Sequence, residues 1–332
     1  MYTPLDIHNT SNCLSLPWHP SVVYIADGWN GHRYWMAQTP FPPMEVLPYR
    51  DRYELPCIHY SDDGLNWQPI DGNPIVDLTQ DEIDANNYYS DPHLVLKDGI
   101  MELYFRYTIL TNRQLEGNKT CLLRCISSDG FNWSQPVVIA DLRKQDDKAV
   151  WGEQIISQAV CWHGNQYRCW YVDKSSYHSD RKIRLSVSAD GKTWNRNKLC
   201  MLDGPQIDPW HIDVQYYDGM YQMVVYDMNK LSWYESEDGL HFRYVSEILQ
   251  PSPHRYDFFT DGLYRACSVK TDQEIRIYFS AKRKDRTYIG LLATQDRIHY
   301  RRINGIKCIQ WLPVVWKAYV KAFFKYLKHI FK

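Results

Sequence analysis

The stretch Ser61–Trp67, SDDGLNW, decides the fold of this chain, because a closely similar motif, here called the repeated word, occurs four more times. They are SSDGFNW (Ser127–Trp133), SADGKTW (Ser188–Trp194), SEDGLHF (Ser236–Phe242) and the degraded TQDRIHY (Thr294–Tyr300). Their aspartates are separated by 66, 61, 48 and 58 residues. That period is longer than a WD40 repeat and approaches the kelch length. The sequence therefore predicts five similar structural units.

Sequence segments with strand-like composition flank every repeated word. In the second unit, CLLRCIS precedes the word and PVVI follows it, and both are rich in β-branched or apolar residues. Upstream lies a hairpin, DPHLVLKDGIMELYFRYT, in which Asp98-Gly99 supplies the turn. Each unit thus holds four strands, and no helical period occurs before residue 310. A β-sandwich or a solenoid is the alternative, but a β-sandwich would not require five copies of the motif.

We therefore expect an all-β fold, a five-bladed β-propeller of four-stranded antiparallel blades, in which each sheet buries both faces against its neighbours. The domain covers residues 1–309, with blades near 19–70, 91–140, 157–202, 211–249 and 264–309. The repeated word is the turn between the third and fourth strands, at the bottom face. Its Ser and Asp form the turn, its Gly adopts a positive φ, and its aromatic residue packs between blades. Chemistry is expected at the opposite, top face, where the innermost strands begin.

Composition narrows the function classes. The 38 Lys+Arg balance 39 Asp+Glu, which gives no charge argument for nucleic acid as a partner. Aromatic residues make up 15% of the chain, which suits strands and also the stacking of rings on sugars. Nine cysteines without a CxxC pair indicate reduced thiols and a cytoplasmic setting. We expect no secretory signal at the N-terminus and no membrane-spanning helix.

Five blades with a short acidic word opening the innermost strand resemble the five-bladed glycosidase superfamily. That superfamily includes the arabinanases and xylosidases of glycoside hydrolase family 43 and the invertase-type enzymes of family 32. The resemblance covers Trp18 to Lys307. It implies three carboxylates at the top of the channel: a base or nucleophile from blade 1, an orienting aspartate from blade 2 and a general acid from blade 3. The repeated word is also similar to the sialidase Asp-box, SxDxGxxW, although it is one residue shorter and sialidases have six blades.

Alignment of the strand starts shows how far the resemblance extends. Asp91, in SDPH, matches the blade-2 aspartate together with its proline. Blade 1 has His19 where the base aspartate is expected, and blade 3 has no glutamate at the usual place. The nearest candidate for the general acid is Glu153, four residues earlier. Asp213 opens the inner strand of blade 4 and is a further candidate carboxylate. The resemblance thus implies catalytic roles for these side chains but an incomplete hydrolytic triad.

Each of these residues has a structural alternative. Asp91 is either a functional carboxylate or a strand cap, and Asp213 either a second carboxylate or a partner of Arg265. His19 is a general base, a ligand of a substrate hydroxyl or a satisfied core histidine. The expected substrate-binding residues line the same face: Glu54, His93, Trp210, His211, Arg265, Arg50 and Arg52.

Some of these substrate-binding residues have alternatives of their own. Trp210 either stacks on a sugar or packs between blades. Arg50 and Arg52 either clamp a carboxylate or phosphate or are simply solvated. His19, His93 and His211 converge on the axis, but no local ligand spacing demands a metal. No cofactor is predicted, and a structural calcium in the channel is an alternative without sequence support.

The strand pattern ends before residue 310, and the sequence of residues 310–332 predicts a basic amphipathic helix. Lysines 317, 321, 325, 328 and 332 fall within a stripe of about 80° on a helix, with aromatic and aliphatic residues opposite. Such a helix is typical of an interface with anionic lipid, and docking on the propeller is the alternative. The expected membrane-binding residues are Trp316, Lys317, Lys321, Phe323, Phe324, Lys325 and Lys328.

The propeller fold and the C-terminal helix together predict a cytoplasmic enzyme that is peripheral to the inner face of the cell membrane. Its substrate would be an oligo- or polysaccharide, for example a bacterial surface glycan, of which it cleaves or transfers a glycosyl unit. The alternatives are a glycan-binding propeller without catalysis and a scaffold in a membrane-associated polysaccharide assembly system. A catalyst requires two carboxylates, or a carboxylate and His19, facing each other at the top face.

Overall fold

The computed structural model describes most of the chain. The described residues are 1–8, 16–41, 54–111, 114–174, 181–228 and 230–330. Side chains are not described at 111–118, 308, 318–319, 322–323 and 325–330.

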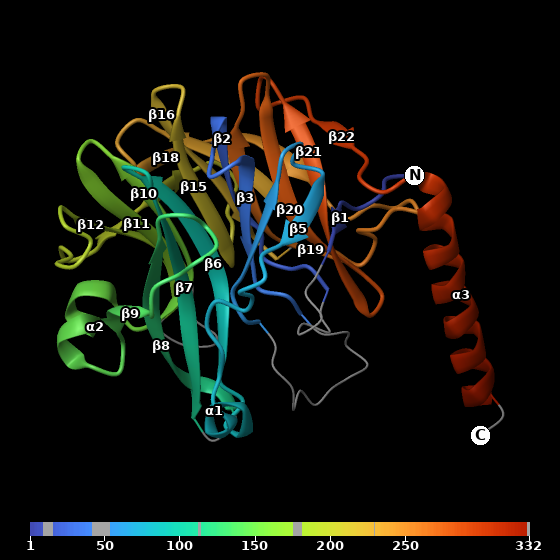
Figure 1. Ribbon diagram of the computed structural model, residues 1–332, viewed down its shortest axis with the longest axis horizontal. Helices are drawn as coiled ribbons and strands as arrows, with labels where there is room; N and C mark the ends of the chain where they lie inside the picture. Colours follow the sequence, from blue (N-terminus) through green and yellow to red (C-terminus); the bar gives the residue numbers. More distant parts are fainter. Residues whose placement is uncertain (9–15, 42–53, 112–113, 175–180, 229, 331–332) are drawn as a thin grey trace.

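Five separate sheets form the body of the molecule (Figure 1). Blade 1 has the order β1-β5-β4-β3-β2, with β1 (Asp6–Ile7), β2 (Ser21–Trp29), β3 (His32–Gln38), β4 (Cys57–Ser61) and β5 (Asn66–Pro69). Blade 2 comprises β6 (Tyr88–Lys97), β7 (Ile100–Thr111), β8 (Gln114–Ser127) and β9 (Val137–Asp141). Blade 3 comprises β10 (Ile155–His163), β11 (Gln166–Asp173), β12 (Lys182–Ser188) and β13 (Lys198–Leu199).

Blades 4 and 5 complete the ring. Blade 4 has the order β14-β18-β17-β16-β15, with β14 (Met201–Asp203), β15 (His211–Tyr217), β16 (Met220–Tyr226), β17 (Leu231–Ser236) and β18 (His241–Leu249). Blade 5 comprises β19 (Gly262–Lys270), β20 (Ile275–Arg283), β21 (Arg286–Thr294) and β22 (Arg301–Ile303). Three helices are added, α1 (Gln80–Asp84), α2 (Gln145–Trp151) and α3 (Cys308–Ile330).

The innermost strands close a circle. β2 contacts β6, β6 contacts β10, β10 contacts β15, β15 contacts β19, and β19 returns to β2. The predicted five-bladed propeller is therefore confirmed. Blades 1 and 4 differ from the prediction, because each gains a fifth, outer strand that pairs in parallel: β1 with β5, and β14 with β18.

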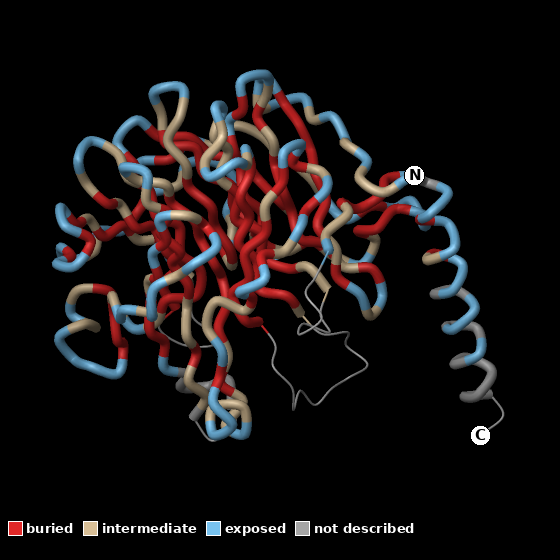
Figure 2. The backbone as a smooth tube through the Cα atoms, viewed as in Figure 1, coloured by how far each residue is buried: buried red, intermediate tan, exposed pale blue. Residues whose placement is uncertain are grey.

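Five hydrophobic clusters hold the blades together, and each joins two adjacent blades. Figure 2 shows the buried residues concentrated in the sheets and the exposed ones in the turns. The aromatic residue of every repeated word lies in the cluster shared with the preceding blade: Trp67, Trp133, Trp194, Phe242 and Tyr300. The words thus pack the blades against one another, as predicted.

The repeated turn is built by the same hydrogen bonds each time. In blade 1, Asp63 Oδ1 accepts from the backbone N–H groups of Leu65 (2.7 Å) and Asn66 (2.9 Å). Ser61 Oγ accepts from Gly64 N at 2.9 Å. Asp129, Asp190, Asp238 and Asp296 repeat the pattern. Since these carboxylates are committed to their own turns, the repeated word is structural.

Two further expectations can be compared with the structure. Seven described cysteines are free and buried: Cys57, Cys121, Cys125, Cys161, Cys169, Cys200 and Cys267. The cytoplasmic setting that the thiols suggested stays a prediction. The C-terminal helix begins at Cys308, two residues before the expected start, and among the described residues no helix is long and apolar enough to cross a membrane.

Candidate functional site

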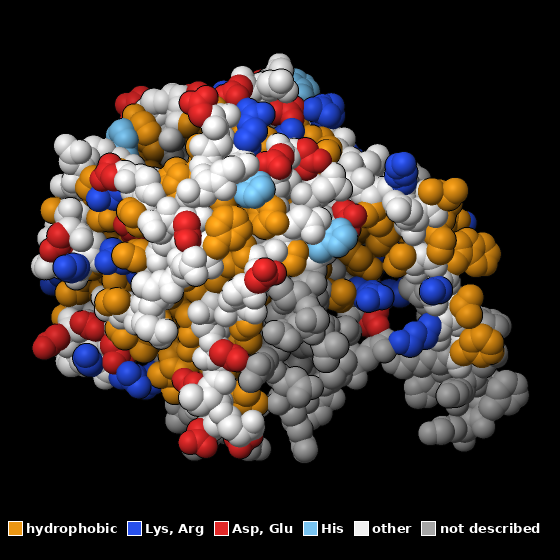
Figure 3. Space-filling model, viewed as in Figure 1, with side chains coloured by type: hydrophobic (Ala, Val, Ile, Leu, Met, Phe, Trp, Pro, Cys, Tyr) orange, Lys and Arg blue, Asp and Glu red, His pale blue; other side chains and the backbone are white. Residues whose placement is uncertain are grey.

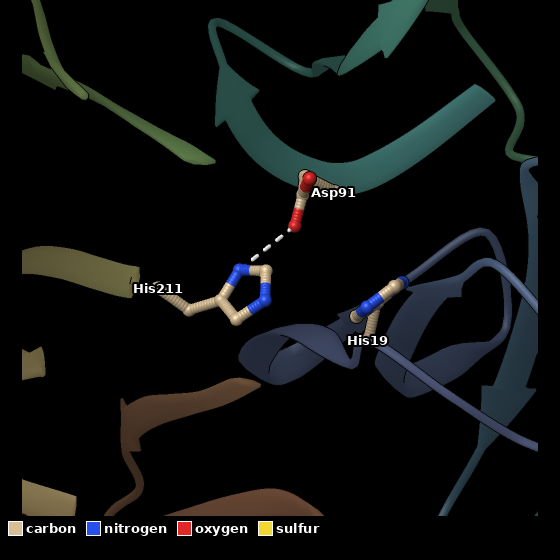
Figure 4. A group of neighbouring side chains, drawn as sticks. All are labelled: His19, Asp91 and His211. Atoms are coloured by element: carbon tan, nitrogen blue, oxygen red, sulfur yellow. Dashed lines mark ion pairs between the residues drawn. The ribbon is translucent and has the colours of Figure 1, made fainter. Parts of the chain in front are cut away.

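His19, Asp91 and His211 meet at the starts of the inner strands of blades 1, 2 and 4 (Figure 4). Their side chains point toward one another, and one nitrogen or oxygen atom from each lies within 4.8 Å of the others. All three are buried, with Asp91 fully so. The structure therefore brings His19 and a carboxylate together, which the sequence set as a condition for catalysis.

The backbone at the site is strained. His19, Glu54 and Asp91 each have φ of 54°, in the left-handed region that non-glycine residues rarely adopt. His19 and Asp91 also precede prolines, which restrict them further. A conformation of this kind costs roughly 1–3 kcal/mol per residue and persists where the surrounding fold enforces it, commonly at functional sites.

Asp91 is held as a carboxylate by three partners. Its Oδ1 lies 3.0 Å from His211 Nδ1 and 3.2 Å from Arg265 Nη1, while its Oδ2 lies 3.0 Å from Arg106 Nη2. Burial opposes the charge, but His211 and Arg106 outweigh it and hold the pKa of Asp91 well below its usual range. Asp91 is therefore ionised throughout the neutral range.

Both histidines of the cluster are neutral and have unused nitrogen atoms. Burial lowers the pKa of His19 and of His211 below the ordinary value. His19 Nδ1 lies 2.6 Å from Thr39 Oγ1, whereas its Nε2 has no hydrogen-bond partner among the described residues. His211 Nδ1 faces Asp91 Oδ1 at 3.0 Å, and its Nε2 has no hydrogen-bond partner among the described residues. Buried polar atoms without partners are rare and call for an explanation.

Glu54 adds a second carboxyl group beside Asp91. It is 8% exposed and lies three residues before β4, and its backbone N–H donates to Pro40 O at 2.9 Å. Burial, and then repulsion from Asp91, raise the pKa of Glu54 to about 8. Arg106 and Lys282 act in the opposite direction. A carboxyl group with such a pKa can both accept and give a proton near neutral pH.

An aromatic wall lines one side of the cluster. The Tyr264 ring lies 4.3 Å from that of His211 and 5.3 Å from that of His19, and it stacks on Trp18 at 4.9 Å. Trp210 Nε1 donates to Tyr264 Oη at 2.9 Å. Arg181 and Lys174 lie over the Trp210 indole, at 4.6 and 5.3 Å from the ring centroid. Trp210 is thus part of the wall, and cations already lie against it.

His93 and Asp213 form a second, deeper layer. They follow Asp91 and His211 by two residues, so they face the channel one step further along the same strands. His93 Nε2 lies 2.9 Å from Val160 O, and its Nδ1 is 3.5 Å from Asp213 Oδ1. Asp213 Oδ2 accepts from Ser268 N at 3.0 Å, and burial raises the pKa of Asp213 to about 6. Neither residue belongs to the upper cluster.

Beyond this layer the channel opens to the other face. A funnel of about 410 Å³ is lined by residues from all five inner strands, among them Val22, Leu96, Cys161, Gln215 and Lys270. The His93–Asp213 layer therefore lies between the cluster and this bottom opening.

Other predicted site residues lie elsewhere. Glu153 is exposed, its carboxylate lies 2.7 Å from Lys148 Nζ, and it is not a member of the cluster. Arg265 is fully buried and is committed to Asp91 and to Gln158 O (3.1 Å), so it supports the site from behind. Arg50 and Arg52 lie outside the described residues.

Sequence reasoning missed Arg106 and Tyr264. The signal for Arg106 was present: the Asp98-Gly99 hairpin pairs Lys97 with Ile100. Counting back in register from that pair places Arg106 opposite Asp91. A bulge shifts the observed pairing by one, to Ser90 with Arg106. Tyr264 opens the inner strand of blade 5 in the alignment that places His19, Asp91 and His211 at the strand starts. That position was the signal, although Tyr264 was not named as a site residue.

Comparison with known proteins supports the fold. No protein-family model matches the chain. A curated relative, the A type blood N-acetyl-α-D-galactosamine deacetylase of Flavonifractor plautii, is 24% identical over 322 residues. The match covers 80% of this chain but only 40% of the relative, so this chain spans about two fifths of that protein's length.

Two solved structures show the same architecture. An N-acetylgalactosamine deacetylase from F. plautii, in complex with blood group B trisaccharide, superposes with a TM-score of 0.67 and 20% identity, covering 87% of this chain and 92% of that one. A family 43 β-xylosidase/α-arabinofuranosidase from a compost metagenome, in complex with xylotriose, gives 0.63 and 11%, with 92% and 99% covered. The chain therefore shares its fold with these deacetylase and glycosidase structures. The sequence predicted the likeness to the glycosidases but not the likeness to the deacetylase.

Proposed function

We propose that this protein is a hydrolase that removes the acetyl group from an N-acetylated sugar of a glycan. The observation that carries the proposal is the buried His19–Asp91–His211 cluster of two neutral imidazoles and a carboxylate, in which the Nε2 atom of each histidine has no hydrogen-bond partner among the described residues. Two histidines and a carboxylate are a common ligand set for a catalytic divalent metal. The named activity of the curated relative, deacetylation of N-acetylgalactosamine, supports this over glycosidic cleavage.

The residues of the cluster fit a metal ion in their donor chemistry. His19 Nε2 has no partner in the described part of the chain, while its Nδ1 lies against Thr39 Oγ1. In this arrangement an outer partner fixes the orientation of a ligating histidine. A bound ion would polarise the acetamide carbonyl and lower the pKa of a coordinated water. Arg106 and Arg265 oppose a cation at Asp91, so we expect metal affinity to increase with pH as Glu54 ionises.

Glu54 is the group of this site that is suited to proton transfer. In hydrolysis, a water O–H bond breaks as its oxygen bonds to the acetamide carbon, and the ionised Glu54 accepts the proton. As the C–N bond breaks, Glu54 gives that proton to the leaving amine, so the products are acetate and an amino sugar. Tyr264, which is half-buried beside both histidines, offers an aromatic side chain against which a sugar ring can be positioned.

Glycosidic cleavage or glycosyl transfer is the second candidate. One observation favours it: Glu54 and Asp91 are neighbouring carboxyl groups whose pKa values are pushed apart, as in an acid and its partner. Asp91, however, is fully buried and held by Arg106, Arg265 and His211, which restrains it from attacking a sugar carbon. A glycan-binding propeller without turnover is the third outcome to be tested.

The products separate these functions. The full chain is incubated with an oligosaccharide that ends in N-acetylgalactosamine, after chelation and after addition of Zn²⁺, Mn²⁺ or Co²⁺. We expect metal-dependent release of acetate and a free amine, seen by mass spectrometry and by an amine-specific label. Release of a monosaccharide would favour the glycosidase, and binding without either product would overturn catalysis.

A pair of matched carboxylate variants tests the proposed proton-transfer group. We expect Glu54→Gln to lower kcat by at least about 100-fold, since general acid–base catalysis contributes 10²–10⁴-fold. Glu153→Gln should leave the rate unchanged, because that side chain is exposed and pairs with Lys148. Calorimetry of metal binding to both variants shows whether the site is still formed. Loss of activity in Glu153→Gln alone would return the general acid to the position implied by the family resemblance.

A further inference from the structure

The first turns of helix α3 are docked on the propeller. Trp311 is 1% exposed, donates from Nε1 to Tyr256 O at 2.8 Å, and lies edge-on to Tyr288 with ring centroids 5.2 Å apart. Val315 is fully buried in the cluster shared by blades 4 and 5. This docked face accounts for one apolar side of the helix, which fits the docking alternative of the sequence analysis.

A second apolar stripe runs along α3 and is exposed. It comprises Ile309, Leu312, Trp316, Val320 and Phe324, which are 76%, 40%, 66%, 47% and 59% exposed. At 100° per residue these positions span about 120°, on a side separate from Trp311 and Val315. Figure 3 shows hydrophobic side chains along the outer edge of this helix. A large exposed apolar patch on a folded domain marks an interaction surface.

The charge next to this stripe identifies the kind of surface it suits. Lys317 and Lys321 are exposed beside the stripe. Residues 304–332 hold six lysines and neither Asp nor Glu. Phe323, Lys325 and Lys328, which the sequence assigned to the same surface, have side chains outside the described residues. Apolar residues including an aromatic one, flanked by lysines without acids, match an anionic lipid interface.

We propose that α3 binds the propeller to an anionic bilayer surface, with the exposed stripe in the interface and the lysines at the headgroups. In Figure 1 the C-terminal end of α3 extends toward the same end of the molecule as α1, the short helix that precedes β6. This inference does not depend on the deacetylase proposal.

Vesicle flotation of the full chain tests it, with neutral phosphatidylcholine vesicles compared with vesicles that also contain phosphatidylglycerol. We expect flotation only with the anionic vesicles, decreasing with salt. Lys317→Glu/Lys321→Glu should weaken partitioning by at least about 25-fold, from roughly fivefold per lysine. Trp316→Ser/Val320→Ser should abolish it. Both positions of each pair are exposed, so the fold should persist.

Matched controls change the same residue types elsewhere. Lys192→Glu and Ile298→Ser, both on exposed turns, should float as the wild type does. Equal flotation of the wild type and both α3 variants, or no flotation at all, would overturn the proposal. So would a dimer, seen by light scattering, that Trp316→Ser/Val320→Ser disperses, because the stripe would then join two copies of this chain. Deacetylation of a soluble glycan should be unchanged in the α3 variants, which keeps this test separate from that of the catalytic function.

Discussion

A fully buried carboxylate is stable only if its partners remain, and Asp91 depends on arginines from two different blades. Arg106 comes from β7 and Arg265 from β19, so the ion pairs also tie blades 2 and 5 across the channel. Removal of one partner from a buried pair is costly because the remaining charge is uncompensated. The site and the stability of the ring are therefore linked through one side chain.

We expect Arg265→Met to lower the free energy of unfolding by about 3 kcal/mol. It should also strengthen divalent metal binding, because Arg265 is one of the two cations that oppose a positive ion at Asp91. Urea denaturation and calorimetry measure the two effects. Arg33→Met is the control: its partner Asp272 is 58% exposed, and surface pairs of this kind contribute about 0–1 kcal/mol. Equal losses in the two variants would contradict this account of Asp91.

His59 makes stability depend on pH away from the candidate site. Burial lowers the pKa of His59 to about 4, below the value near 6.5 of an unfolded chain. Since the unfolded state binds the proton more readily, stability is fully present above pH 6.5 and is lost as pH falls toward 4. The loss between pH 7 and pH 5 should be about 2 kcal/mol from this residue. His59→Asn should remove that part of the dependence in denaturation curves at the two pH values. An unchanged pH dependence would mean that His59 is not buried in the neutral form.

Only part of the candidate site could be predicted from individual residues of the sequence. Asp91, His19 and His211 were recognised because they open inner strands, and such positions converge in a propeller. His93 and Asp213 were chosen by the same rule, yet residues two apart on a strand share a face, so the sequence does not say which layer meets the substrate. Glu54 was named, but its raised pKa depends on burial beside Asp91, which only the folded chain creates.

At the scale of elements, the repeated turn determines how closely adjacent blades approach. Gly130, in the second word, has φ of 80°, and a Cβ there would lie 2.4 Å from two atoms of the Trp35 ring in blade 1. Gly99 has a similar φ of 76°, but no atom lies within 4 Å of the equivalent position. Both glycines therefore adopt a positive φ, but only Gly130 lacks room for a Cβ atom.

Substitutions at Gly99 and Gly130 separate the stability cost of backbone strain from the stability cost of disturbed packing. We expect Gly99→Ala to cost about 1 kcal/mol, the penalty of a positive φ for a residue with a Cβ. Gly130→Ala should cost at least about 2 kcal/mol more, because Trp35 must move in a close-packed interface. Thermal unfolding of both variants provides the comparison. Similar losses would show that contact between the turn and the neighbouring blade is unimportant.

The repeated word predicts the five sheets but not the short outer strands that two of them gain. Five sheets follow from five words, since each word fixes one turn and the strands beside it. The outer strands β1 and β14 are two and three residues long and pair in parallel with segments of distant sequence. No local pattern of that length predicts a strand, so these additions were missed.

At the scale of the whole molecule, the ring is closed by the first residues of the chain. Tyr2 is buried against Phe258 and Phe259 of the blade 4–blade 5 cluster, at 5.1 and 5.6 Å between ring centroids, and its hydroxyl bonds to Leu291 O. Leu5 N donates to Ile289 O at 2.9 Å, and β1 then pairs with β5 of blade 1. One segment thus crosses blade 5 and joins blade 1.

Because a propeller has one junction where the last blade meets the first, we expect this segment to control cooperative unfolding. Tyr2→Ala should lower the free energy of unfolding by about 3–5 kcal/mol, the range for truncating a large buried aromatic side chain. Hydrogen exchange should increase first in β21 and β5, the two strands that the segment joins. Tyr256→Ala is the control, since its side chain is 37% exposed and its loss should cost less than about 1 kcal/mol. If Tyr2→Ala destabilised all five blades equally, with no early exchange in β21 and β5, the segment would contribute only ordinary core packing, and closure of the ring would depend on the contact of β19 with β2.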